Sequence, residues 1–328
     1  MSPPPANAIC RPSAGKMLHL WTSHLHPVPL PEGHPFPAAK YAPMVERLIA
    51  EELVAEAHLH LSEPAPLEWI HRVHDPAYVA RILAGSLTDA EVRVLGLPWS
   101  TQLVTRARAA LYGTVMAART ALTHGIAGNL AGGSHHAFRD RAEAYCLFND
   151  LAVAIELLRD EGRVRRPFVL DLDVHQGNGT AAIFAGDPDV FTYSIHSEHN
   201  YPARKEAGSH DVPLPDGCRD EEYLAALDAT VLAALDATVP AALDRHAPDF
   251  VLYQAGVDAL EQDRFGRLAL THEGLAARDA RVFRWLEARG LPVAVTLGGG
   301  YGRPLEHSVE AHVNVWREAA AALRRRGS

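Results

Sequence analysis

Two carboxylates and an imidazole occupy alternate positions of one segment: Asp171, Asp173 and His175. The apolar residues of this segment predict a buried strand over Pro167–Val174, and alternate residues of a strand share a face. The three polar side chains would then form half of a divalent-metal site, and this ligand set suits zinc, iron(II) or cobalt better than calcium. Asp258 could complete the set and leave one position for water and substrate. A hydrogen-bonded polar strand end is the alternative that the spacing leaves open.

A pair of histidines, His135 and His136, follows two glycines that permit unusual backbone angles. Adjacent imidazoles can act as a general base and an electrostatic partner when each has a hydrogen-bond acceptor that orients it. Asp171 and Asn178 are the candidate acceptors. Taken singly, each histidine would more commonly be a structural residue with its hydrogen bonds satisfied.

Three glycines precede Tyr301, in the segment Gly298–Tyr301. The segment lacks the lysine of a phosphate-binding loop and the spacing of a dinucleotide site, so it gives little support for a nucleotide. A tyrosine hydroxyl placed here could donate a hydrogen bond to a developing oxyanion. The alternative is a tyrosine that packs over a turn.

These polar segments, with a fourth at Gln254–Asp258, follow strand-like runs, and ligands bind at the carboxyl ends of parallel strands. Alternation of strands with helices predicts one three-layer α/β domain with a mainly parallel sheet. The predicted strands are Pro167–Val174, Val190–Ile195, Asp249–Ala255 and Leu291–Leu297. The predicted helices are Met44–Leu61, Thr101–His124, Leu151–Leu158, Tyr223–Arg245, Thr271–Arg289 and Pro304–Arg324.

The composition excludes several classes of protein. The 328 residues carry 31 basic and 40 acidic side chains, a net charge of -9, which argues against nonspecific nucleic-acid binding. No apolar run reaches the roughly 18 residues of a membrane-spanning helix, so no membrane partner is expected. Three scattered cysteines exclude a disulfide framework or a thiolate metal cage. Residues 1–16, rich in Pro and Ala, are expected to form a flexible leader rather than a secretory signal, and the expected location is the cytoplasm.

Taken together, the motifs resemble the zinc-dependent histone deacetylase superfamily, in particular its class IV-like and bacterial branch. The resemblance is collinear from about residue 20 to 320. Its segments are Arg72–Val79, Gly132–Ala137, Cys146–Asp150, Asp171–Gly179, Asn200–Pro202, Gly256–Asp258 and Leu297–Tyr301, together with Pro31–Pro37.

The resemblance implies an arginase–deacetylase fold with an eight-stranded parallel sheet, formed by residues 17–328 as a single catalytic domain. It implies zinc on Asp173, His175 and Asp258, with iron(II) or cobalt as other options. It also implies a reaction in which an acetyl, or a longer acyl, group is hydrolysed from lysine side chains of proteins or peptides. An acetylpolyamine amidohydrolase shares the same motifs. A metal-binding interaction module without catalysis is the alternative from another class.

Further site residues follow from the resemblance. Asp171 would orient His135, Asn178 would contact His136, and Tyr301 would bind the acetyl oxygen opposite zinc. We expect His136 to transfer the proton and His135 to stabilise charge. The residues expected to flank the acyl-lysine channel are Ala144, Tyr145 and Tyr201. A structural potassium ion would bind backbone groups of Asp171, Asp173, His175 and Ile195, with Ser194.

Two positions depart from the family pattern. Asn178 stands where many members have a carboxylate, so His136 would be held less strongly as a cation. Ala144 stands where glycine is common, which could change the backbone beside the channel.

Overall fold

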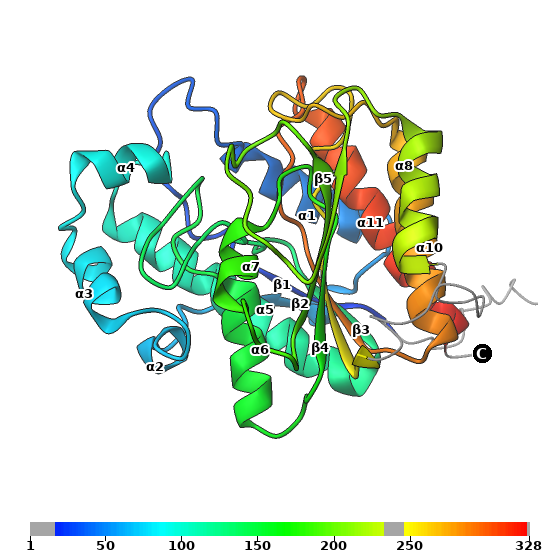
Figure 1. Ribbon diagram of the computed structural model, residues 1–328, viewed down its shortest axis with the longest axis horizontal. Helices are drawn as coiled ribbons and strands as arrows, with labels where there is room; N and C mark the ends of the chain where they lie inside the picture. The colour runs from blue at the N-terminus through cyan, green and yellow to red at the C-terminus, as the bar shows by residue number, and fades with distance from the viewer. Residues whose placement is uncertain (1–16, 233–245, 327–328) are drawn as a thin grey trace, which may run out of the picture.

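The computed structural model describes residues 17–232 and 246–326, and Figure 1 shows a central sheet between two layers of helices. In these residues eight strands form one sheet in the order β2-β1-β3-β8-β7-β4-β5-β6, and every neighbouring pair is parallel. The strands are β1 (His19–Thr22), β2 (Leu59–Leu61), β3 (Ile126–Asn129), β4 (Pro167–Asp171), β5 (Phe191–Ser197), β6 (His210–Leu214), β7 (Phe250–Gln254) and β8 (Val293–Thr296). The predicted three-layer α/β/α architecture is therefore confirmed.

Helices cover both faces of the sheet (Figure 1). One layer contains α1 (Tyr41–Ala50), α8 (Asp220–Leu227), α10 (His272–Ala288) and α11 (Glu306–Arg325). The other side carries α5 (Thr101–His124), α6 (Asp150–Asp160) and α7 (Asn178–Ile183), with α2 (Leu67–Ile70), α3 (Pro76–Ala84) and α4 (Asp89–Leu95) beyond them. Single turns of other helix types occur at Ala38–Lys40, Glu56–His58 and Asp228–Leu232. Within the described ranges, no helix is both long and apolar enough to cross a membrane.

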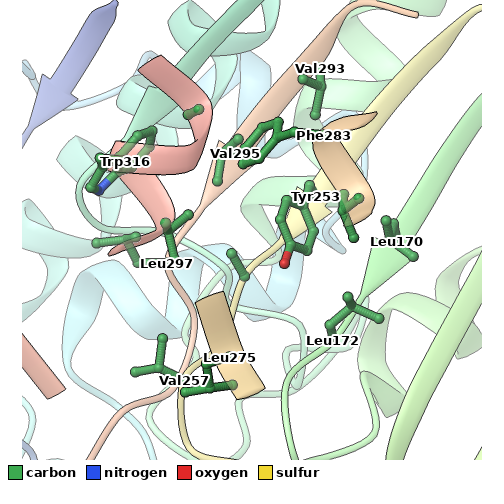
Figure 2. Close-up of a cluster of buried hydrophobic side chains, with 14 of the residues drawn as sticks. Leu170, Leu172, Tyr253, Val257, Leu275, Phe283, Val293, Val295, Leu297 and Trp316 are labelled. Atoms are coloured by element: carbon green, nitrogen blue, oxygen red, sulfur yellow. The ribbon is translucent and has the colours of Figure 1, made fainter. Parts of the chain in front are cut away.

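Alternate residues of the central strands pack into two separate apolar cores, one on each face of the sheet. In β4, Phe168 and Leu170 join the core beneath α10 and α11, whereas Val169 joins the core beneath α5 and α6. Figure 2 shows the first of these cores, in which Phe283 and Trp316 pack against side chains of the strands. Burial on both faces explains why these strands are continuously apolar in sequence.

The predicted helix Thr101–His124 agrees with α5 at both ends. The hydroxyl of Ser100 accepts a hydrogen bond from the N–H of Leu103 and caps the first turn. Gly125 ends the helix at a φ of 88°, which a residue with a side chain rarely adopts. Most of the other predicted strands and helices are found with shifts of a few residues at their ends.

Two predicted elements are wrong in part. The helix predicted over Met44–Leu61 ends at Ala50, because Glu52 has a left-handed φ of 54° and the chain then enters β2. The apolar residues Leu53 and Val54 lie in the turn after the helix and are also buried. Their positions continue the helical spacing of apolar residues, so the sequence pattern extends beyond the helix itself. The strand predicted over Pro167–Val174 ends at Asp171.

Several short strands were not predicted, and two predicted segments lie wholly or partly outside the described residues. The predicted strands do not include β1, β2, β3 and β6, which have three to five residues each. Of the helix predicted over Tyr223–Arg245, the structure describes the part up to Leu232 as α8 and a π-helical turn. The predicted leader, residues 1–16, also lies outside the described residues.

Candidate active site

A cavity of about 480 Å³ opens at the carboxyl ends of the central strands. Four of the segments that line it follow β3, β4, β7 and β8 and correspond to the four polar segments of the sequence. Its lining includes His135, His136, Asp173, His175, Asp258 and Tyr301. The tertiary structure thus brings together residues that are more than 160 positions apart.

Asp173, His175 and Asp258 converge on one point. The Nδ1 atom of His175 lies 3.0 Å from Asp173 Oδ1 and 3.0 Å from Asp258 Oδ2. One ligand atom from each of the three residues lies within 4.8 Å of the other two. Zinc bonds of about 2.0–2.2 Å in a tetrahedron place ligand atoms roughly 3.3 Å apart, so the three side chains fit a divalent metal with little rearrangement.

The charges of this triad also favour a cation. Burial raises the pKa of Asp258 to about 7, and the charge of Asp173 adds to the rise. Burial opposes protonation of His175, but hydrogen bonds to Asp173 and Asp258 and their charges outweigh it and raise its pKa to about 10. Two buried carboxylates around one imidazole therefore require either a proton or a metal ion between them.

Backbone geometry places these ligands after the strand has ended. The N–H of His175 donates to Asp173 Oδ1 at 3.0 Å, and the N–H of Gly299 donates to Asp173 Oδ2 at 2.7 Å. A Cβ atom at Gly299 would collide with the carboxylate of Asp258, and one at Gly256 with that of Asp173. The glycines of both segments are therefore needed because they pack directly on the carboxylates.

His135 and His136 lie beside the triad, and each has the predicted partner. His135 Nδ1 is 2.7 Å from Asp171 Oδ2, and His136 Nδ1 is 2.7 Å from Asn178 Oδ1. Burial opposes protonation of His135, but the charges of Asp171 and Asp173 raise its pKa to about 9. Burial lowers the pKa of His136 well below its usual value, and the charges of His135 and His175 lower it further. The two neighbouring rings thus favour different protonation states.

A buried carboxylate that sequence reasoning gave no role shapes the loop before these histidines. Asp150, the first residue of α6, accepts hydrogen bonds from the N–H groups of Gly133 at 2.9 Å and Ser134 at 2.7 Å. Its Oδ2 also accepts from the hydroxyl of Thr114. The signal in the sequence is Asn149–Asp150 at a helix start, where Asn149 caps the helix.

Tyr301 is held by its ring and its backbone. Its ring packs edge-on against Phe265 at 5.0 Å between centroids and lies 6.0 Å from the ring of Tyr145. Its N–H donates to Asp263 Oδ2 at 2.6 Å. Burial and the charges of Asp258 and Asp173 raise the pKa of Tyr301 well above its usual value. The hydroxyl therefore keeps its proton and can donate it in a hydrogen bond.

Lys40 is a second residue without a role in the sequence analysis. It is 2% exposed, and its Nζ donates to the carbonyl of Gly300 at 3.3 Å and lies 3.2 Å from His312 Nε2. Its position supports the backbone next to Tyr301.

The three predicted channel residues line the same cavity. Ala144 has a φ of 43° and Tyr145 a φ of 69°, so Ala144 keeps the left-handed backbone that glycine would adopt more easily. The ring of Tyr201 lies edge-on to that of His136, 5.1 Å between centroids. Ala144 and Tyr145 therefore form a left-handed turn beside the ring of Tyr201 and the histidine pair.

The residues predicted to hold potassium lie behind the cavity. Ser194 of β5 is in register with Asp171 of β4, and Ile195 follows it. The Ser194 hydroxyl is 2.9 Å from His196 Nδ1. Neither Ser194 nor Ile195 lines the cavity, and potassium at this place stays a prediction.

Comparisons with known proteins identify the family of the chain. Residues 34–316 match the family described as the histone deacetylase domain. The chain is 40% identical to an uncharacterized protein of Picosynechococcus, over 89% of this chain and 94% of that protein. It is 32% identical to the histone deacetylase-like amidohydrolase of Pseudomonas aeruginosa, over 76% of this chain and 67% of that protein.

A solved structure gives the same result for the fold. The crystal structure of an HDAC homologue complexed with SAHA has a TM-score of 0.77 and 25% sequence identity, and covers 93% of this chain and 84% of that one. The predicted arginase–deacetylase fold is confirmed. The family match over most of the sequence, on a sheet of this topology, shows that the chain belongs to the histone deacetylase family.

Proposed function

We propose that this amidohydrolase is a zinc-dependent lysine deacylase that acts on acetylated or longer acylated lysine side chains of proteins or peptides. The observation that supports this choice is the charge of the cavity. Among the described residues of its lining, Asp173 and Asp258 are the acidic ones, whereas Arg93, Arg106 and Arg267 are basic. Arg267 is paired with Asp216 at 3.2 Å, which leaves Arg93 and Arg106 to repel a polyamine with several positive charges. An acyl-lysine chain is neutral and would not be repelled.

The residues at the base of the cavity fit hydrolysis of an amide. Zinc held by Asp173, His175 and Asp258 would polarise the carbonyl and lower the pKa of water toward about 7. His136 has its Nδ1 engaged with Asn178, so its Nε2 is the atom to take a proton from water and return it to the leaving amine.

Two further groups would stabilise the charge that develops on the substrate oxygen. His135, held by Asp171, contributes positive charge. The Tyr301 hydroxyl donates to the oxygen. An interaction module without catalysis would need neither this tyrosine nor two oriented histidines, which is why we favour an enzyme.

The cavity also supports acyl groups longer than acetyl. Its lining continues along α5 through Leu103, Ala107 and Ala110, which are apolar or small. We keep the cytoplasm as the proposed location, because Cys146 and Cys218 are free thiols. Structural potassium near Ser194 is part of the proposal.

A substrate panel tests the proposal. Zinc-loaded protein would be assayed with acetyl-lysine peptides, peptides with longer acyl-lysines, and acetylated polyamines. We expect turnover of the peptides, and Asp258→Ala serves as a control for contaminating activity. Arg93→Glu should improve the KM for acetylated polyamines without improving that for peptides. Turnover of polyamines alone would replace this proposal with the polyamine alternative, and metal binding without any turnover would favour the interaction module.

A further inference from the structure

Glu143 carries a carboxylate that lies behind the histidine pair, next to Asn178. Its Oε2 is 3.2 Å from Asn178 Nδ2 and accepts a hydrogen bond from the Tyr201 hydroxyl at 2.6 Å. Its Oε1 accepts from Arg141 Nε at 2.9 Å. The side chain of Glu143 is 14% exposed. All three of these neighbours of the carboxylate are therefore hydrogen-bond donors.

The contact with Glu143 decides which way the amide of Asn178 faces. A carboxylate that receives three donors acts as an acceptor, so it requires the NH₂ group of Asn178 on its side. The amide oxygen of Asn178 then faces His136 Nδ1, at 2.7 Å. An amide oxygen only accepts, so Nδ1 of His136 carries the hydrogen and Nε2 keeps its lone pair in the neutral ring.

The loop that carries Glu143 is fixed in place. The N–H of Cys146 donates to the carbonyl of Glu143 at 2.8 Å, and the N–H of Glu143 donates back to Cys146 at 3.2 Å. The N–H groups of Ala144 and Tyr145 donate to the carbonyls of Val94 and Leu95 at 3.0 and 2.7 Å. The turn keeps two residues with side chains at positive φ, which is a conformation that persists only when surrounding contacts hold it. These contacts fix the backbone of the loop, and the hydrogen bonds from Arg141, Asn178 and Tyr201 hold the carboxylate itself.

We propose that Glu143 is a positioning residue, which acts through Asn178 to select the tautomer of His136 that can accept a proton at Nε2. This inference rests on the proposed function, in which His136 transfers the proton. Glu143 restores, one residue further away, the negative charge that Asn178 does not supply. Through Tyr201, the same carboxylate links the histidine to the wall of the cavity.

Replacement of the carboxylate by an amide provides a sharp test. In Glu143→Gln, the glutamine would offer one acceptor and one NH₂ group to three donors, so its NH₂ would oppose either Arg141 or the pair formed by Asn178 and Tyr201. This variant should lower kcat by about 10–100-fold with little change in KM, as when a residue that orients a catalytic group is lost. Asn178→Asp alone should also lower kcat, because it places two carboxylates about 3.2 Å apart.

The double variant exchanges the carboxylate and the amide between the two positions, so that a donor again faces an acceptor at each contact. With Asn178→Asp and Glu143→Gln together, the glutamine oxygen faces Arg141 and its NH₂ donates to the new aspartate, which accepts from His136. We expect the double variant to be more active than either single variant. A matched control is Glu161→Gln, which removes the ion pairs with Arg119 and Arg163 outside the cavity and should leave kcat unchanged. Losses that simply multiply in the double variant would overturn the inference.

Nitrogen NMR of histidine-labelled, zinc-loaded protein gives a reading that does not need turnover. The signal of His136, assigned by its loss in His136→Ala, should report a protonated Nδ1 in the unaltered protein. Glu143→Gln should shift it toward a protonated Nε2, and the double variant should restore it. An unchanged signal in Glu143→Gln would refute the role of Glu143. Absence of deacylation with the expected NMR changes would refute the proposed function and leave this inference standing.

Discussion

The hydroxyl of Tyr301 offers the most direct test of the proposed chemistry. Tyr301→Phe removes one oxygen and keeps the ring, whose contacts with Phe265 and Tyr145 involve carbon atoms. The backbone N–H bond to Asp263 is also kept. We therefore expect the free energy of unfolding to change by no more than about 0.5 kcal/mol, as for substitutions that remove no buried contact.

Catalysis should respond very differently. Loss of one oxyanion donor typically lowers kcat on the order of 10²–10³-fold, or about 3–4 kcal/mol of barrier. Because the contact strengthens as charge develops on the oxygen, kcat should fall much more than KM rises. The raised pKa of Tyr301 keeps the hydroxyl protonated, so the ratio of the two rates should be constant with pH over the working range.

The assay compares kcat, KM and thermal unfolding of Tyr301→Phe with those of Tyr112→Phe. Tyr112 lies on α5, stacks on Trp69 and does not line the cavity, so it controls for loss of a tyrosine hydroxyl elsewhere. A folded Tyr301→Phe protein with kcat within about twofold of the unaltered enzyme, far below the loss of an oxyanion donor, would show that the hydroxyl does not act on the oxyanion.

Four other results are expected. Chelation should abolish turnover, and zinc or cobalt should restore it in proportion to bound metal; full activity without metal would contradict the ligand assignment. His136→Ala should lower kcat by about 10²–10⁴-fold with the metal retained, whereas His135→Ala should cost less; the reverse order would exchange their roles. Ala107→Phe should reduce turnover of long acyl groups and spare acetyl, and equal losses would place the acyl chain elsewhere. Burial lowers the pKa of His74 to about 4 from 6.5. The unfolded chain therefore binds more protons at this position between these values, and His74 by itself should lower the free energy of unfolding by up to about 1.4 kcal/mol per unit as pH drops through this window. In denaturant titrations His74→Gln should flatten this slope, and an unchanged slope would exclude His74 as its source.

The amino-acid sequence determined the elements with strong local signals. α5 has a capping serine at its start and Gly125 at its end, and both boundaries were predicted. The central strands β4, β7 and β8 are buried on both faces, so they appear as short apolar runs, whereas β5 is equally buried but alternates apolar with polar residues. Other strands that lack such a run were missed. β3 contains Gly128, which leaves room for the ring of Trp316, and the edge strands β2 and β6 are partly exposed.

The site likewise contains residues that the sequence alone could identify and residues that only the tertiary structure revealed. Asp173, His175, His135, His136 and Tyr301 could be named from the sequence, because each motif combines residue types that metal binding or proton transfer requires. Their order along the chain also placed them at strand ends, where a parallel sheet gathers ligand-binding residues.

Long-range packing decided the rest. The contacts of Glu143 with Asn178 and of Lys40 with Gly300 join residues 35 and 260 positions apart, and no local pattern encodes such pairs. The basic lining of the cavity is likewise invisible in a net charge of -9. Local propensity depends on neighbouring residues, whereas the partners of a buried polar group depend on which distant surfaces the fold presses together.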